Sequence, residues 1–307
     1  LRYHLLDDDS CADDVKKGLG GRILMVPELI SHDTERRLCA AAGDTASRYA
    51  EVLSFTRLAR RVAELVGCAA EECLDNGGRV VAMAAAARQL HSKLKAYAAV
   101  ETKPEFLTEL LDAIDEFKRC CITSDDLLAA SSMTEGSLAQ KLEELSLLLE
   151  AYDSLTAQGK RDPRDQMNWL LEQLEEGTFG QEHVFYIDGF PDFTRQHLAI
   201  LEYLIQVSPC VTVSLNCDRP DSHMLAFEKA ASTAQELIRC AKRADIPVEI
   251  IKVPVNQTVL NPLRDCLYQG PIPEPMEAVT ACQAESAYQE AVSAAERIRH
   301  LIRSGCR

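Results

Sequence analysis

Two aspartates and a glutamine follow a short apolar run and could place a carboxylate on a metal ion. His183–Ile187 (HVFYI) is typical of a buried strand, and Asp188, Asp192 and Gln196 follow it. A strand ending in Asp presents its carboxylate at the carboxyl edge of a parallel sheet, where it can bind Mg²⁺ beside a nucleotide. A strand that ends in a plain Asp188-Gly189 turn is equally common, and this alternative stays open.

The same stretch, VFYIDGFPDFTRQ, resembles motif II of superfamily 1 helicases. That motif is Asp-Glu-aromatic-Gln-Asp with a further Gln a few residues later. The resemblance implies that the Glu orients the attacking water in NTP hydrolysis. Gly189 stands at the Glu position, so we expect a degenerate motif of Asp188, Gly189, Asp192 and Gln196 with a badly impaired chemical step.

A loop that cradles phosphates is expected after the first strand. Such a loop needs G-x-x-x-x-G-K-[ST], so that backbone N–H groups and a Lys meet the phosphates. Residues 6–17 hold no Gly-Lys-Ser/Thr, and Asp7, Asp8 and Asp9 would repel a triphosphate. Either the loop has been lost or residues are missing there, and as written the segment should not bind ATP in this manner.

A second group of residues could bind nucleic acid. In residues 51–67 (EVLSFTRLARRVAELVG) a strand runs into a helix. Phe55 offers a ring on which a base could stack, and Arg57, Arg60 and Arg61 could reach phosphates, although not all three face one way. The candidates for strand contacts in this segment are Phe55, Thr56, Arg57 and Arg61. The alternative is an amphipathic helix with solvated arginines and Phe55 in the core.

Ser31 is a further candidate for a strand contact. It follows the apolar run Arg22–Pro27 and leads into a helix. A helix N-terminus at a sheet edge can hold a phosphate of a nucleic-acid backbone. A simple capped helix remains the other interpretation.

These residues must be positioned by strands that alternate with helices. The predicted strands are Leu1–Leu6, Arg22–Pro27, Tyr49–Phe55, His183–Ile187, Val211–Leu215 and Val248–Val253. The predicted helices between and after them are Asp13–Gly18, Thr34–Ala42, Arg57–Val66, Thr194–Val207, Thr233–Ala244 and Ser286–Arg303. This alternation predicts a parallel α/β sheet.

The stretch from residue 69 to 176 is different, because strand signals are nearly absent. Its predicted helices are Val80–Ala99, Pro104–Cys120, Thr134–Ala157 and Asp162–Glu176. The simplest architecture is one α/β domain that carries a large helical insertion.

Composition limits the class of protein. The chain has 307 residues, 47% of them hydrophobic, which excludes global disorder, and no apolar run is long enough for a membrane span. The net charge of −15 argues against a generic basic nucleic-acid binder. However, residues 69–176 carry −10 of it and residues 1–68 only −1, so a strand path near Phe55 stays open.

Twelve cysteines at spacings unlike zinc or iron–sulfur sites predict reduced, mostly buried thiols in the cytoplasm, and no metal or cofactor in this segment. Neither end of the chain looks like a natural domain terminus, so we expect a piece of something larger.

Taken in order, several segments resemble the N-terminal part of the AddB-type subunit of bacterial ATP-dependent helicase–nucleases of the AddAB or RexAB type. The segments are ILMVPE…TERRL, EVLSFTRLARRVAELVG, RDPRDQMNWLLEQLEEGTF, VFYIDGFPDFTRQHLAILEYLI, VTVSLNCD and EAVSAAERIRHLIRSGCR. The combination of LSFTRLARRV with YIDGFPDFT is fairly specific.

The resemblance implies a RecA-like, P-loop NTPase-type 1A domain over residues 1–68 and 177–307, with an all-helical 1B insertion over residues 69–176. It implies a region that is not the motor but guides the 3′-ending DNA strand and scans it for a recombination hotspot, in double-strand-break repair by homologous recombination. The partner would be the AddA-type subunit of a heterodimer, acting on single- and double-stranded DNA. ATP with Mg²⁺ and an iron–sulfur cluster would be used outside this chain.

Two other functions stay open. One is an active DNA-dependent NTPase, with Asp188 on Mg²⁺ and Asp192 in place of the missing Glu as the base. The other is a structural scaffold whose acidic helical stretch docks a partner protein.

Overall fold

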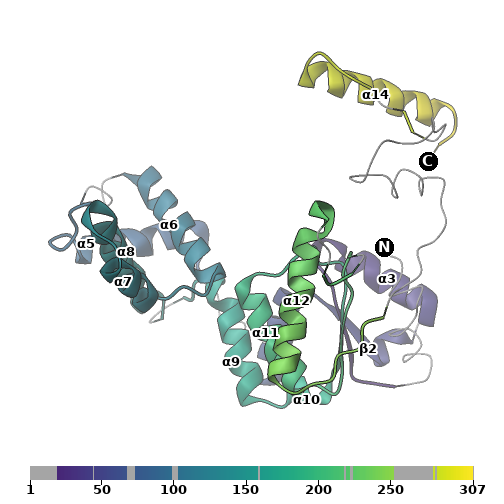
Figure 1. Ribbon diagram of the computed structural model, residues 1–307, viewed down its shortest axis with the longest axis horizontal. Coiled ribbons are helices and arrows are strands. Elements are labelled where there is room, and N and C mark those ends of the chain that lie inside the picture. The colour runs from purple at the N-terminus through teal and green to yellow at the C-terminus, as the bar shows by residue number, and fades with distance from the viewer. Residues whose placement is uncertain are drawn as a thin grey trace. The chain divides into compact units, whose positions relative to one another are not determined.

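The computed structural model describes residues 19–43, 45–67, 73–98, 103–157, 160–217, 219–221, 224–251, 279–280 and 282–306 (Figure 1). The chain divides into two units, Leu1–Val253 and Pro254–Arg307. The second unit contains helix α14 (Ala287–Arg303), which Ser286 caps by accepting the N–H of Gln289. This helix confirms the one predicted near the end of the chain.

The first unit is built on a four-stranded parallel sheet in the order β2-β1-β3-β4. Its strands are β1 (Arg22–Met25), β2 (Ala50–Leu53), β3 (Val184–Ile187) and β4 (Val211–Val213). Each confirms a predicted strand but is shorter than the apolar run that indicated it. The predicted α/β class with a parallel sheet is confirmed.

Alternate residues of the central strands enter two separate cores. In β1, Ile23 and Met25 pack among the residues of α4 (Phe55–Leu65), α9 (Gln166–Glu176) and α11 (Arg195–Val207). Leu24 packs on the opposite face with Leu38 of α3 (Ser31–Ala42). Successive side chains of a strand point to opposite faces, so a strand covered on both sides is apolar throughout. This explains why ILM in β1 and VFYI in β3 are continuous apolar runs.

The helices of the first unit fall into two groups. Those around the sheet are α3 (Ser31–Ala42), α4 (Phe55–Leu65), α9 (Gln166–Glu176), α10 (Phe179–Glu182), α11 (Arg195–Val207) and α12 (Glu228–Arg243). The others, which we call the helical block, are α5 (Asn76–Gln89), α6 (Pro104–Arg119), α7 (Ser124–Ser132) and α8 (Gly136–Ala157). Short 3-10 turns are η1 (Glu28–Ile30), η2 (Ala46–Arg48), η4 (Pro163–Asp165) and η5 (Leu225–Phe227).

The helical block has a hydrophobic core of its own. Met83, Ile114, Leu148 and Tyr152 are fully buried in it and come from α5, α6 and α8. Figure 1 shows the block projecting to one side of the sheet and its covering helices. Helix α9, although it lies within residues 69–176, packs on α4 and α11 and buries Leu170 in the core beside the sheet.

The helical block differs from the prediction at two helices, α5 and α7. Helix α5 ends at Gln89 rather than near Ala99, because the Glu144 carboxylate accepts the backbone N–H groups of Lys95, Ala96 and Tyr97 at 3.0 Å each. Helix α7 was not predicted, although Thr123 and Asp126 form a capping box at its start.

The predicted strand Val248–Val253 is wrong over its described residues, 248–251, which form no strand. Ile250 and Ile251 are 64% and 68% exposed there, and a strand needs a paired neighbour that the described part of the chain does not provide. The strand predicted for Leu1–Leu6, the helix at Asp13–Gly18 and the position of the phosphate loop lie outside the described residues.

Nine of the twelve cysteines lie within the described residues. The prediction that they are mostly buried is wrong, because only Cys240 is buried and six are exposed. The exposed ones lie at helix ends or in loops: Cys73, Cys120, Cys121, Cys210, Cys282 and Cys306.

Candidate nucleic-acid interface

The residues singled out in the sequence gather at the carboxyl edge of the sheet. From β1 the chain continues to β2 on one side, and β3 pairs with β1 on the other. Ligands of open α/β sheets bind in the crevice outside the strand ends at such a reversal of strand order. Pro27 and Glu28 follow β1, Ser54 follows β2 and Asp188 follows β3, so all stand at this edge.

A group of hydrogen bonds orders the loop after β1. Ser31 donates through Oγ to the carbonyl oxygen of Glu28 at 2.9 Å, and Ser54 donates to the Glu28 carboxylate. Ser54 also caps α4, because its Oγ accepts the N–H of Arg57 at 3.1 Å. Ser31 is buried, and its hydroxyl is used within its own loop.

Gly189 is held in a conformation that favours glycine. Its φ is +76°, and a Cβ added there would lie 3.0 Å from Ile30 Cδ1 and 3.5 Å from Pro27 Cδ. A side chain at this position is therefore strained by the backbone and also crowded by the loop after β1. A glutamate of the kind found in helicase motif II does not fit without local rearrangement.

The two aspartates of the same stretch lie in different environments. Asp188 is buried, and its N–H donates to the carbonyl of Met25 at 2.9 Å, which extends the pairing of β3 with β1. Asp192 is exposed and forms an ion pair with Lys229 of α12 at 3.3 Å. Among the described residues, no three His, Cys, Asp or Glu side chains gather in a metal-binding arrangement. Of the two aspartates, Asp188 is the one that directly follows β3 at the carboxyl edge of the sheet.

Phe55 is part of the core, which is the alternative interpretation of its segment. Only 4% of it is exposed, and its ring stacks on His197 with centroids 4.0 Å apart and planes at 14°. Phe190 and Phe193 contact it edge-on, at 5.5 Å and 6.5 Å. In this conformation the Phe55 ring is not exposed to a base.

Burial controls the protonation of His197. The surrounding apolar groups lower the pKa of His197 to about 4, and the nearby Asp192 carboxylate only partly opposes this. The ring is therefore neutral near pH 7.

Phe190 and Phe193 are aromatic residues at this edge that sequence reasoning missed. Both are half-buried, and their rings lie 5.2 Å apart in the loop between β3 and α11. Unlike Phe55, they keep part of their surface in contact with solvent. The stretch GFPDF contains the signal, since two aromatic residues in a loop that follows a buried strand have no obvious core position.

The arginines of α4 that were predicted to contact phosphates differ in their partners. Arg61 is paired with Glu51, with Nε 3.0 Å from Oε2. Arg57 is half-buried, forms no ion pair with the described residues, and lines a small cavity of about 190 Å³ beside β2 and α3. Thr56 is half-buried beside it, and Arg60 is exposed on the same helix.

Gln196 is not at the strand edge. It is buried in α11, and its amide donates to the carbonyl of Arg164 at 3.0 Å and to Asn168 Oδ1 at 3.2 Å. The glutamine predicted to belong to a degenerate catalytic motif therefore contacts the segment that connects the sheet helices to the helical block.

One known protein family matches most of the chain. The protein family described as ADDB, N-terminal, matches residues 9–262. The chain belongs to this family. The match includes the whole sheet, the helical block and both strand-end loops, and it stops before α14.

Curated relatives of this ADDB family member share one description, the B subunit of an ATP-dependent helicase/deoxyribonuclease. Such a protein of Thermoanaerobacter sp. (strain X514) is 32% identical over 197 residues, which are 64% of this chain and 17% of the relative. Proteins of the same description from Caldanaerobacter subterraneus subsp. tengcongensis and Clostridium kluyveri are 29% and 26% identical over 80% and 85% of this chain. They are covered over 22% and 24% of their own length, so the chain spans about a fifth of the relatives it matches.

No helix in the parts of this family member that the structure describes is long and apolar enough to cross a membrane.

Proposed function

We propose that the chain is the helicase-like, DNA-guiding region of the B subunit of an ATP-dependent helicase/deoxyribonuclease, and that it is not the motor. The family membership supports this assignment to the B subunit. The conformation of Gly189 is the observation that supports the proposal that this region is not the motor. In this role the region guides a DNA strand and scans it for a hotspot during double-strand-break repair by homologous recombination.

The loop geometry at Gly189 is what favours a region without hydrolytic activity. Gly189, at the position that would hold the water-orienting carboxylate, has a positive φ. A Cβ added there would lie 3.0 Å from Ile30 Cδ1. The rival NTPase hypothesis needs Asp192 as the substitute base. The Asp192 carboxylate instead forms an ion pair with Lys229. ATP with Mg²⁺ and the iron–sulfur cluster remain proposals for the longer protein.

A phosphate-release assay separates these two functions. The chain is incubated with ATP, Mg²⁺ and single-stranded DNA, and compared with the variant Asp188→Asn. We expect no DNA-stimulated release above background from either protein. Turnover by the unmodified chain that is lost in Asp188→Asn would favour the NTPase instead.

The strand contacts proposed for this region lie at the carboxyl edge of the sheet. Arg57 and Thr56 face solvent in part, and the half-buried rings of Phe190 and Phe193 pack on Phe55 at the start of the same helix. Bases stack on aromatic rings and phosphates pair with Arg, so this arrangement is suited to a single strand. In this proposal Phe55 holds the two partly exposed phenylalanines in place, and Ser31 and Arg61 shape the edge.

We propose a discontinuous domain division as well, with the sheet as a 1A domain and the helical block as a 1B insertion. Because α9 packs against α4 and α11, we count it with the sheet rather than with the insertion.

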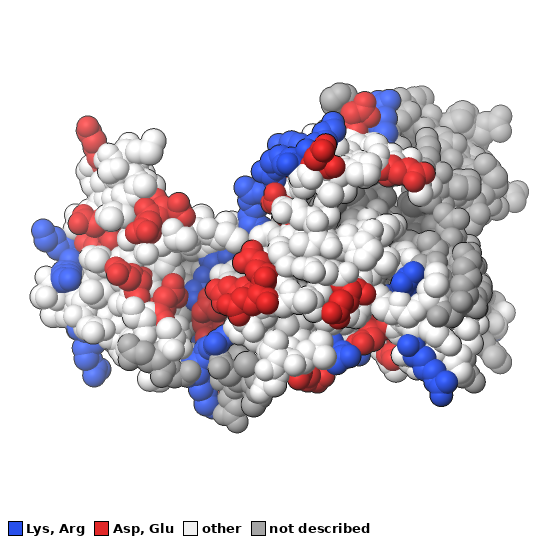
Figure 2. Space-filling view, turned by 90° about the horizontal axis from the view of Figure 1, so that it is seen from below, with Lys and Arg blue, Asp and Glu red and all other residues white. Residues whose placement is uncertain are grey.

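The acidic helical block favours an additional docking role that is compatible with guiding DNA. Residues 69–176, which contain the helical block and α9, carry −10 of the net charge, and Figure 2 shows many Asp and Glu side chains on one face of the block. An AddA-type partner with a basic surface would be attracted to it. Co-purification with that partner should weaken as the salt concentration rises, and binding that is independent of salt would contradict this role.

A further inference from the structure

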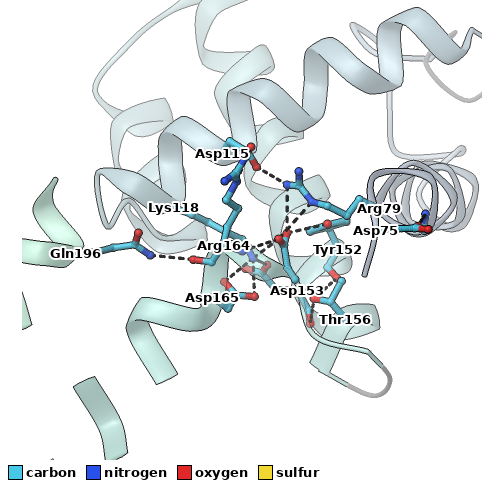
Figure 3. Close-up of polar contacts among 12 residues, drawn as sticks. Asp75, Arg79, Asp115, Lys118, Tyr152, Asp153, Thr156, Arg164, Asp165 and Gln196 are labelled. Atoms are coloured by element: carbon cyan, nitrogen blue, oxygen red, sulfur yellow. Dashed lines mark hydrogen bonds and ion pairs between the residues drawn. The ribbon is translucent and has the colours of Figure 1, made fainter. Parts of the chain in front are cut away.

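An ionic cluster with a buried centre joins the helical block to the helices of the sheet (Figure 3). At its border the side chains of Asp153, Arg164 and Asp165 are 47%, 42% and 33% exposed. The cluster contains three cations and four carboxylates from α5, α6, α8 and the segment around η4. Its charged members are Arg79, Asp115, Lys118, Asp153, Asp162, Arg164 and Asp165. This cluster has no part in the proposed DNA contacts, and it lies where the helical block meets the sheet helices.

Arg79 and Asp162 form the centre of the cluster. Arg79 Nε lies 3.3 Å from Asp162 Oδ1, and a second Arg79 nitrogen donates to Asp115. Tyr152 donates to Asp162 Oδ2 at 2.8 Å. These side chains are nearly inaccessible to water, so their positions are fixed by one another rather than by solvent.

Lys118 neutralises the other side of the cluster. Its Nζ lies 2.7 Å from Asp165 Oδ1 and 2.8 Å from Asp153 Oδ1. Burial lowers the pKa of Lys118, but these carboxylates outweigh burial and raise it above its usual value. The ammonium therefore stays charged, and α6, α8 and the η4 segment are held together through it.

Arg164 connects this cluster to the sheet helices. Its Nε donates to Asp115 Oδ2 at 2.7 Å, and its backbone carbonyl accepts the amide of Gln196 at 3.0 Å. Figure 3 shows the Gln196 side chain reaching from α11 toward the backbone of Arg164. Helix α11 begins directly after the loop of Phe190 and Phe193, where Thr194 caps it by accepting the N–H of His197.

We propose that Gln196 is a positioning residue that couples the loop at residues 188–194 to the orientation of the helical block, through Arg164 and Asp115. A buried polar network has few arrangements in which every group is paired, so a shift at one end changes the other. The coupling goes beyond the proposed function, and it can be measured without DNA or nucleotide.

Hydrogen exchange followed by mass spectrometry on the whole chain tests the coupling. Arg164→Met removes the guanidinium that joins Asp115 but keeps the backbone carbonyl that Gln196 contacts. We expect exchange in peptides covering residues 188–197 to rise by about five- to tenfold, the effect of one lost hydrogen bond, while peptides of β1 stay unchanged. Arg164→Lys, which keeps a cation near Asp115, should restore part of the protection.

The effect of the Gln196 amide on the helical block is tested with Gln196→Met, which keeps the side-chain volume and removes the amide. Exchange should rise in residues 161–168 and in the last turn of α6. Gln173→Met is the matched control, because the Gln173 amide lies on α9 and donates to Glu176 of the same helix, at 3.3 Å. If Gln196→Met fails to fold, Arg164→Met alone decides.

Two results would overturn the proposal. One is a rise confined to the neighbours of the replaced residue, with residues 188–197 unaffected by Arg164→Met. The other is a uniform rise over the whole chain, which would indicate general loss of stability rather than coupling.

Discussion

At the residue scale, Gly189 decides between a hydrolytic and a non-hydrolytic strand end. We predict that Gly189→Ala lowers the free energy of unfolding by about 1–2 kcal/mol, the cost of a left-handed conformation for a residue with a Cβ. Gly20→Ala is the control, because a Cβ at Gly20 meets no atom within 4 Å and its φ is not positive. Urea unfolding of both variants measures the difference, and equal stabilities would contradict the assigned conformation.

His197 provides a second test at the residue scale. The pKa of His197 is about 4 when folded, against 6.5 as the ordinary value. Below pH 6.5 the unfolded chain takes up a proton that the folded chain excludes, so the free energy of unfolding falls as the pH drops from about 6.5 to about 4. His197→Gln should remove this part of the pH dependence.

The His197 titration can be followed directly by NMR. The ring resonance, assigned by its absence in His197→Gln, should not shift between pH 8 and about pH 5. A midpoint near 6.5 would mean that the ring is solvated, and its stacking on Phe55 would then be wrong.

At the scale of secondary-structure elements, local patterns predicted what depends on local forces. The four strands were predicted from short segments rich in apolar residues. Only the central strands β1 and β3, which are covered on both faces, hold uninterrupted apolar runs (ILM and VFYI), whereas β2 contains Glu51 and β4 contains Thr212. The end of α5 was not predicted, because it depends on Glu144, which lies about 50 residues away in the chain. Val248–Val253 has the composition of a strand, but composition does not supply a paired neighbour.

The ionic cluster leads to a prediction about how the helical block is held. Lys118 faces the carboxylates of Asp153, Asp162 and Asp165 within 3.6 Å. Lys118→Met leaves Asp153 and Asp165 without this cation, whereas Asp162 keeps Arg79. Because Asp153 and Asp165 are partly exposed, we expect a loss of about 3 kcal/mol in the free energy of unfolding, the lower end for a broken buried pair.

Lys141→Met is the matched control for this change, because Lys141 is exposed on α8. It should stay within about 0.5 kcal/mol of the original chain. Guanidinium unfolding measures both, and a similar small effect for Lys118→Met would show that the cluster is better solvated than its burial indicates.

At the scale of the whole molecule, the sequence predicted the family and the edge of the sheet but not the arrangement of the site. Phe55 and Phe190 cannot be told apart by residue type, and only packing shows that Phe55 is buried while Phe190 is partly exposed. Gln196 matched a catalytic pattern by spacing, yet it contacts Arg164 because α9 and α11 pack together. Tertiary contacts therefore give these residues roles that their spacing in the chain does not reveal.

The most direct test of the central proposal is the binding of a fluorescent single-stranded oligonucleotide by this chain, measured by anisotropy over a range of salt concentrations. We predict weak binding that falls as salt rises, and a weaker affinity for Arg57→Ala with a log–log salt slope smaller by about 1. Arg88→Ala, which removes an exposed cation of the helical block, should bind like the original chain. Binding that is absent, or equal in Arg57→Ala and the original chain, would contradict a strand path at the carboxyl edge of the sheet.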